Sequence, residues 1–117
     1  MIKHFSKNEF TCKCGCDETF INDELLVKLD KAREFAEIPF KINSGYRCSE
    51  HSESLKNPTS SHIKGLAADI SCKDSSTRAI MMDALVYAGF ERFGLDKGFI
   101  HVDIDNLEKP SPVIWLY

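Results

Sequence analysis

Three residues of metal-ligand type, His62, Asp69 and His101, are the first candidates for chemistry in this sequence. Asp69 lies inside the apolar run 66–70, where a carboxylate needs a cation or several hydrogen-bond donors because burying it unpaired is costly. Two imidazoles and one carboxylate are a known ligand set for catalytic zinc, since three protein ligands leave the fourth position for water. Zinc lowers the pKa of that water and polarises a carbonyl, which suits hydrolysis of an amide bond.

The second histidine lies in a segment that reads as a strand. Period-two alternation in residues 99–104 places Phe99, His101 and Asp103 on one face. The core face then consists of Ile100, Val102 and Ile104. The spacing alone is weak support for a metal site, because the sequence lacks the His-Glu-x-x-His helix of many zinc peptidases. A structural histidine on an exposed sheet face, paired with a nearby carboxylate, stays open as the alternative.

The elements that must position these residues alternate between helices and strands. Apolar spacings of three and four predict a helix over 22–36, capped by Asn22 or Asp23 and ended by Pro39. A second helix is expected from the caps at 74–76 to about Tyr87, closed by Gly89. Short strands are predicted at 40–44, 66–72, 93–95, 99–104 and 113–117. The late strands are too closely connected for parallel crossovers, so we predict an α+β fold with a small, mostly antiparallel sheet and two main helices.

Between the first two strands lies a long polar segment, residues 45–64, and loops of this length in small domains are often functional. The whole chain of 117 residues is sized for a single domain, 1–117. Its formal charge of −3 speaks against binding nucleic acid through bulk phosphate attraction. Apolar runs are too short for membrane insertion, and the N-terminus has no apolar core like that of a secretory signal. We therefore expect a monomer that is cytoplasmic when synthesised.

Local sequence patterns add a resemblance to a known family. Residues 60–69, SSHIKGLAAD, fit the pattern SxHxxGxAxD, and residues 44–47 read SGYR. Residues 99–103, FIHVD, follow downstream, with Trp115 near the end of the chain. In this order the elements resemble the zinc D-Ala-D-Ala carboxypeptidase family of peptidoglycan peptidases, which has the Hedgehog/D-Ala-D-Ala peptidase fold. The leading run 10–16, FTCKCGC, is similar to the N-terminus of its small, often phage-associated members.

The resemblance implies one zinc ion, held by His62, Asp69 and His101. It also implies that Arg47 faces the substrate, where a permanently charged guanidinium fork matches a carboxylate or a developing oxyanion. Ser60 would support the ligand loop or contact substrate, and Trp115 would wall the cleft. The alternatives are an arginine that pins a loop through backbone carbonyls and a tryptophan that belongs only to the core.

The catalytic acid is where the sequence departs from the family pattern. Many relatives carry Glu or Asp three residues before the second histidine, and here that position is Gly98. The remaining candidates are Asp103, on the same strand face as His101, and Asp96, in the preceding turn. We favour Asp103 and keep Asp96 as a rival. Asp103 could instead orient a ligand without transferring a proton.

Five cysteines leave three alternatives open. Cys12, Cys14 and Cys16 lie at alternate positions, unlike the Cys-x-x-Cys spacing of structural zinc sites, while Cys48 follows the SGYR element and Cys72 ends a predicted strand. They could be buried thiols, a disulfide could join the N-terminal segment to Cys48, or thiolates could hold a second metal. A reducing cytoplasm favours thiols, with the disulfide second and the metal third.

These observations together predict a zinc peptidase that hydrolyses an amide bond in peptidoglycan stem peptides, as a carboxypeptidase or an endolysin-type endopeptidase. Its partner would be the peptidoglycan peptide, and it would act on the cell wall if it is a phage-type lysin. A non-catalytic, zinc-stabilised module that binds the wall or builds a virion is the alternative, because Gly98 permits it. A zinc amidase or dipeptidase acting outside the wall is a third, weaker one.

Overall fold

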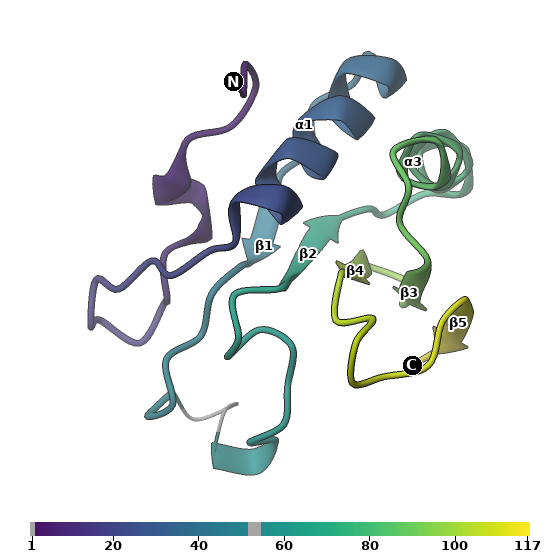
Figure 1. The fold of residues 1–117 in the computed structure, drawn as a ribbon. Coiled ribbons are helices and arrows are strands. Elements are labelled where there is room, and N and C mark those ends of the chain that lie inside the picture. The colour runs from purple at the N-terminus through teal and green to yellow at the C-terminus, as the bar shows by residue number, and fades with distance from the viewer. Residues whose placement is uncertain (1, 52–54) are drawn as a thin grey trace.

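The computed structural model describes residues 2–51 and 55–117 (Figure 1). Its elements in chain order are the 3-10 helix η1 (Lys7–Phe10), α1 (Asp23–Ala36), β1 (Ile42–Ser44), β2 (Ala67–Ser71), α3 (Ser75–Tyr87), β3 (Arg92–Leu95), β4 (Phe99–Asp103) and β5 (Val113–Leu116). All seven predicted helices and strands are present within about two residues of their expected ends, a usual uncertainty in element boundaries. Part of the predicted polar segment, residues 52–54, lies outside the described residues.

Side-chain caps fix where both helices begin. The Asn22 carboxamide oxygen accepts hydrogen bonds from the backbone N–H groups of Glu24 and Leu25, which selects Asn22 over Asp23 as the cap of α1. Asp74 accepts in the same way from Thr77 at the start of α3. Each cap satisfies backbone donors that have no partner within the first helical turn. The predicted starts of the two helices are thereby confirmed.

Among the described residues, five strands form one sheet in the order β1-β2-β4-β3-β5. Every neighbouring pair is antiparallel except β3 and β5, which run parallel. The predicted α+β class with a mostly antiparallel sheet is confirmed. The parallel pair arises because the chain leaves β4 and crosses through residues 104–112 before β5 joins the far edge of β3.

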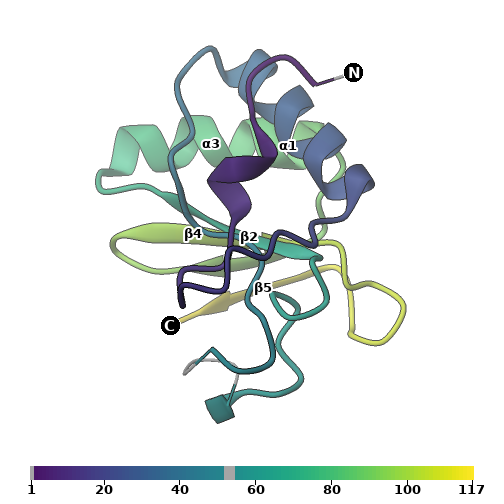
Figure 2. The same ribbon diagram turned by 90° about the vertical axis from the view of Figure 1, so that its left-hand side faces the viewer.

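The helices cover one face of this sheet, as Figure 2 shows. The core-facing residues of β4 are the predicted ones: Ile100 and Val102 are fully buried, and Ile104 packs against the same core. Helix η1 was not predicted, because four residues are too few to show a periodicity. Ser6 and Glu9 form a capping box around it, and Phe10 anchors it in the core.

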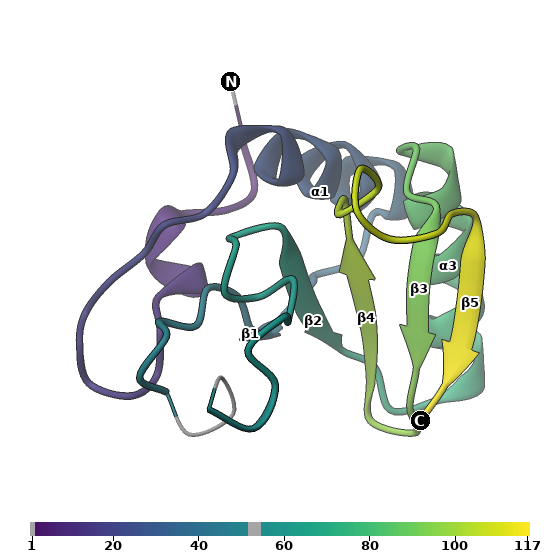
Figure 3. The same ribbon diagram turned by 60° about the horizontal axis from the view of Figure 1, so that its bottom comes forward.

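The other face of the sheet is flanked by loops, in which the structure describes a short helical piece at residues 55–56 (Figure 2). Figure 3 views this face, with residues 45–51 and 55–64 of the polar segment running in front of β1 and β2, α1 along the top and α3 behind β3 and β5. Side chains that point away from the core therefore meet this segment rather than a second layer of helices. No helix in the described part of the chain is long and apolar enough to span a membrane.

Candidate active site

Strand register aligns a row of residues across the face away from the helices. Asp69 of β2 lies directly opposite His101 of β4, His101 lies opposite Gly94 of β3, and Gly94 lies opposite Trp115 of β5. Directly paired residues project to the same face, so the row brings Asp69, His101 and Trp115 together. A β-carbon at Gly94 would lie 2.5 Å from the Trp115 Nε1, so only glycine leaves room for the indole, whose ring centre is 5.2 Å from that of His101.

His62 reaches the row from the polar segment. The chain turns sharply at Gly65, which has a φ of +72° and whose absent side chain would collide with the backbone of Phe20. The His62 Nδ1 lies 2.7 Å from the carbonyl oxygen of Gly45, and its Nε2 lies 3.3 Å from the Asp69 Oδ1. Because the carbonyl can only accept, Nδ1 donates to it, and Nε2 is the nitrogen that faces Asp69.

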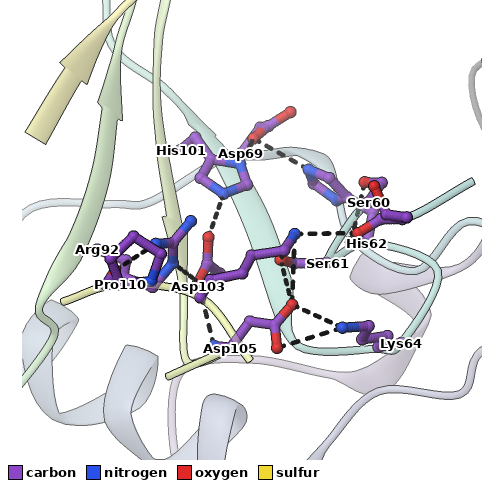
Figure 4. Close-up of polar contacts among 12 residues, drawn as sticks. Ser60, Ser61, His62, Lys64, Asp69, Arg92, His101, Asp103, Asp105 and Pro110 are labelled. Carbon is purple, nitrogen blue, oxygen red and sulfur yellow. Dashed lines mark hydrogen bonds and ion pairs between the residues drawn. The ribbon is translucent and has the colours of Figure 1, made fainter. Parts of the chain in front are cut away.

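His101 is held between two carboxylates, as Figure 4 shows. Its Nδ1 lies 2.9 Å from the Asp69 Oδ1, and its Nε2 lies 2.7 Å from the Asp103 Oδ2. Asp103 is 1% exposed, and its other oxygen accepts from the Arg92 Nε at 2.6 Å and from the backbone N–H of Asp105 at 3.1 Å. Both oxygens of Asp103 are thus engaged by groups around the row.

These contacts determine the charge states. Burial alone would raise the pKa of the Asp69 carboxyl, but hydrogen bonds from His101 and His62 outweigh it and hold that pKa well below its usual range. The pKa of Asp103 is lowered in the same way, against burial, by His101 and Arg92. Burial alone would lower the pKa of His101, whereas its two carboxylate partners raise it. Both aspartates are therefore ionised at neutral pH.

A pocket of about 450 Å³ opens over this row. Its lining includes all three ligand-type residues, His62, Asp69 and His101, and three aromatic side chains, Phe99, Trp115 and Tyr117. The basic residues Arg47, Lys56 and Lys109 also line it, so cationic groups surround the buried carboxylates. Such a cavity attracts anions from solvent.

Of the remaining predicted site residues, Arg47 and Ser60 line this pocket and Asp96 does not. Arg47 and Ser60 line the pocket with Trp115; Arg47 Nη2 lies 3.6 Å from the Asp69 Oδ2, and the Ser60 hydroxyl accepts from the backbone N–H of His62. Asp96 lies elsewhere, in a separate depression beside Arg78 and Tyr117, where it accepts a hydrogen bond from the backbone N–H of Gly98. The structure therefore brings Asp103, but not Asp96, to the row.

The comparison with known protein families finds a match over most of the chain. Residues 3–103 match the family described as Peptidase M15. The chain belongs to the Peptidase M15 family. Searches among curated proteins and among solved structures give no match. Because the family match ends at residue 103, it includes His62, Asp69 and His101 but not Trp115.

Peptidases of the M15 family depend on zinc, and the donors of this chain fit that ion. One ligand atom from each of His62, Asp69 and His101 lies within 4.8 Å of the other two, and all three residues are buried. Hydrogen bonds to the Gly45 carbonyl and to Asp103 occupy the outer nitrogen of each imidazole. The inner nitrogens both face the Asp69 Oδ1 and are the atoms that would bind a shared metal.

The sequence analysis did not identify the residues that hold the His62 loop of this M15 site in place through hydrogen bonds. Asp105 accepts from the Ser61 hydroxyl at 2.8 Å and from the Lys64 ammonium at 3.1 Å, and Lys109 lies 3.4 Å from the same carboxylate. This network ties the His62 loop to the segment between β4 and β5. Arg92 was also missed. Once the β3–β4 register is known, Arg92 lies directly opposite Asp103, and this pairing of a cation with a carboxylate predicts their contact.

Proposed function

We propose that this chain is a zinc peptidase that hydrolyses an amide bond in peptidoglycan stem peptides, with one catalytic zinc held by His62, Asp69 and His101. The observation that carries the proposal is the placement of these three buried donors at the base of a pocket lined by basic groups. A zinc ion held there would polarise the substrate carbonyl and lower the pKa of a water molecule. Membership of the M15 family supports the same chemistry.

The other lining residues suit a peptide that carries a free carboxylate. Arg47 is 3.6 Å from Asp69 and donates its Nε to the Ser44 hydroxyl at 3.2 Å, so its terminal nitrogens keep donors for a substrate anion. Lys56 and Lys109 add positive charge at the pocket. The D-Ala end of a stem peptide carries a free carboxylate and methyl side chains, and the aromatic wall around Trp115 would contact those methyl groups.

Within this proposal Asp103 is a positioning residue rather than the general base. Its Oδ2 accepts from the outer nitrogen of His101 while Arg92 and the backbone of Asp105 engage Oδ1, so three of the about four acceptor sites of this carboxylate are already occupied. A carboxylate behind a metal-binding imidazole orients the ring and raises its basicity. The contacts therefore favour the alternative role that the sequence left open for Asp103.

The direct test is digestion of defined stem peptides, ending in D-Ala-D-Ala or in a single D-Ala, with product masses and released amines measured. We expect cleavage by the zinc-loaded protein, loss of cleavage with EDTA or in His62→Ala, and recovery when zinc is returned to the parent chain. Release of the terminal residue identifies a carboxypeptidase, and an internal cut identifies an endopeptidase. Zinc-loaded protein that leaves both peptides and intact sacculi uncut would overturn the proposal.

A non-catalytic wall-binding module remains the second candidate because of one specific feature. Among the described residues that line the pocket, the carboxylates are Asp69 and Asp103, and both are already paired. Gly98 at the usual acid position adds none. This candidate predicts that the protein binds sacculi stoichiometrically and releases no amines, which the same digestion measures.

A further inference from the structure

Four of the five cysteines gather at a second place, away from the row that holds His62, Asp69 and His101. The sulfur atoms of Cys12, Cys14, Cys16 and Cys48 all lie within 4.8 Å of one another. The Cys14 sulfur is 3.4 Å from that of Cys12 and 3.3 Å from that of Cys48. In a tetrahedral zinc site with Zn–S bonds of about 2.3 Å, neighbouring sulfurs are about 3.8 Å apart. The cluster is close to that size.

The local fold explains why alternate cysteines can converge. In an extended strand, residues two apart lie roughly 6.6 Å from each other, too far for one ion. Residues 13–16 instead form a turn, in which Gly15 has a φ of +98° that glycine adopts without strain. The backbone N–H of Cys12 donates to the Glu18 carbonyl and closes the loop. The chain therefore coils around the sulfurs rather than running past them.

The fourth sulfur comes from a segment more than thirty residues away. Cys48 follows Arg47 directly, and its backbone N–H donates to the Cys12 sulfur at 3.3 Å. The Cys16 sulfur accepts from the backbone N–H of Glu18 at 3.5 Å. Hydrogen bonds to ligand atoms of this kind orient the ligands at metal sites. Two separated segments thus supply four sulfur ligands and part of the surrounding hydrogen bonds.

From this arrangement we infer a second, structural zinc site formed by Cys12, Cys14, Cys16 and Cys48. Four protein ligands close the coordination shell, so this ion stabilises the fold and activates no water. Cys72 is the cysteine left over; it is buried in the core beside α3. The site would fasten the N-terminal segment to the residues after β1, where the backbone N–H of Arg47 donates to the His62 carbonyl.

The first experiment counts metal in the full chain. Protein saturated with zinc and then freed of excess by gel filtration should contain two zinc ions per chain. The Cys14→Ser/Cys16→Ser double variant should keep one zinc ion, bound by His62, Asp69 and His101. The His62→Ala variant should also keep one zinc ion, bound by the four cysteines. Cys72→Ala is the matched control and should keep two. A single zinc in the parent chain that disappears in His62→Ala would overturn the inference.

Cobalt substitution identifies the ligands without relying on a folded variant. Cobalt bound to thiolates gives sulfur-to-metal charge-transfer absorption in the near ultraviolet, which a site of two histidines and one aspartate does not give. We expect this band in the parent chain and in His62→Ala. Its absence in the parent would contradict the site, as would a non-reduced mass lower by two hydrogens, which shows a disulfide. Five freely reactive thiols in the zinc-saturated protein would also contradict it.

Discussion

Replacing Asp103 with asparagine separates the two roles open to this side chain. Asparagine keeps the shape and one acceptor oxygen but removes the charge that faces the outer nitrogen of His101 at 2.7 Å. A hydrogen bond to a charged partner contributes about 1.5–3 kcal/mol, against about 0.5–1.5 kcal/mol for a neutral one. The midpoints of the two ranges differ by roughly 1.3 kcal/mol, which corresponds to a loss of zinc affinity close to tenfold. Asp103→Ala, which removes the acceptor as well, should approach the hundredfold end of the range of about 10–100-fold for such partners.

The assay needs two measurements on each protein. Competition with a chromogenic chelator gives the zinc dissociation constant, and peptide cleavage at saturating zinc gives the turnover. If Asp103 positions His101, zinc affinity falls about tenfold in Asp103→Asn and saturating zinc restores most of the turnover. If Asp103 is the general base, zinc affinity stays unchanged while turnover falls by about a hundred- to ten-thousand-fold. Unchanged affinity with such a loss of turnover would refute the positioning role.

Two controls keep this comparison interpretable. Thermal unfolding must show that Asp103→Asn is folded at the assay temperature, because Arg92 would lose a charged partner at a side chain only 9% exposed. Asp96→Asn tests the rival base: its carboxylate lies outside the pocket and accepts from the backbone of Gly98. We expect Asp96→Asn to change neither zinc affinity nor turnover by more than about twofold, since surface substitutions away from such features have small effects.

Three further outcomes follow from the contacts around the site. Zinc bound at about a thousand times its dissociation constant stabilises the fold by about 4 kcal/mol, so EDTA should lower the melting temperature as well as abolish cleavage. Gly94→Val should displace Trp115, the single tryptophan, and change its fluorescence together with the KM for peptide. Asp105→Asn should destabilise the chain by about 1–3 kcal/mol, because it breaks buried charged contacts to Ser61 and Lys64. Burial alone would raise the pKa of Asp105, but these partners hold it below the ordinary 3.8, so its contribution is complete above about pH 5 and is lost progressively as the pH falls through the lowered pKa.

Each of these outcomes has a control or a contradicting result. An unchanged melting temperature after complete zinc removal would contradict metal stabilisation. Unaltered tryptophan fluorescence in Gly94→Val would show that the position of the Trp115 indole does not depend on having glycine at residue 94. Glu108→Gln is the matched control for Asp105→Asn, because Glu108 also pairs with Lys64 but is 71% exposed, where ion pairs contribute only about 0–1 kcal/mol. Acid unfolding that is equally steep in the parent chain and in Asp105→Asn would contradict the assigned pKa shift.

Local signals in the sequence were sufficient for the helices and for the ligand types. Asn22 and Asp74 are caps whose side chains act on the next turn, so neighbouring residues alone specify where α1 and α3 begin. Alternation over residues 99–104 separated the isoleucines and valine that face the core from His101 and Asp103, because strand side chains alternate whatever the partner strand. Helix η1 escaped prediction because its capping box covers only one turn.

The sequence by itself determined which side chains could bind metal and on which strand face they lie, since residue type and backbone periodicity are local properties. Tertiary structure decided their partners. Register places Asp69 beside His101, and the β3–β4 pairing sets Arg92 against Asp103, which favours a positioning role over proton transfer. It also gathers Cys48 with cysteines of the N-terminal turn, although their spacing had ranked a metal last. Such contacts join residues far apart in the chain, so no local pattern contains them.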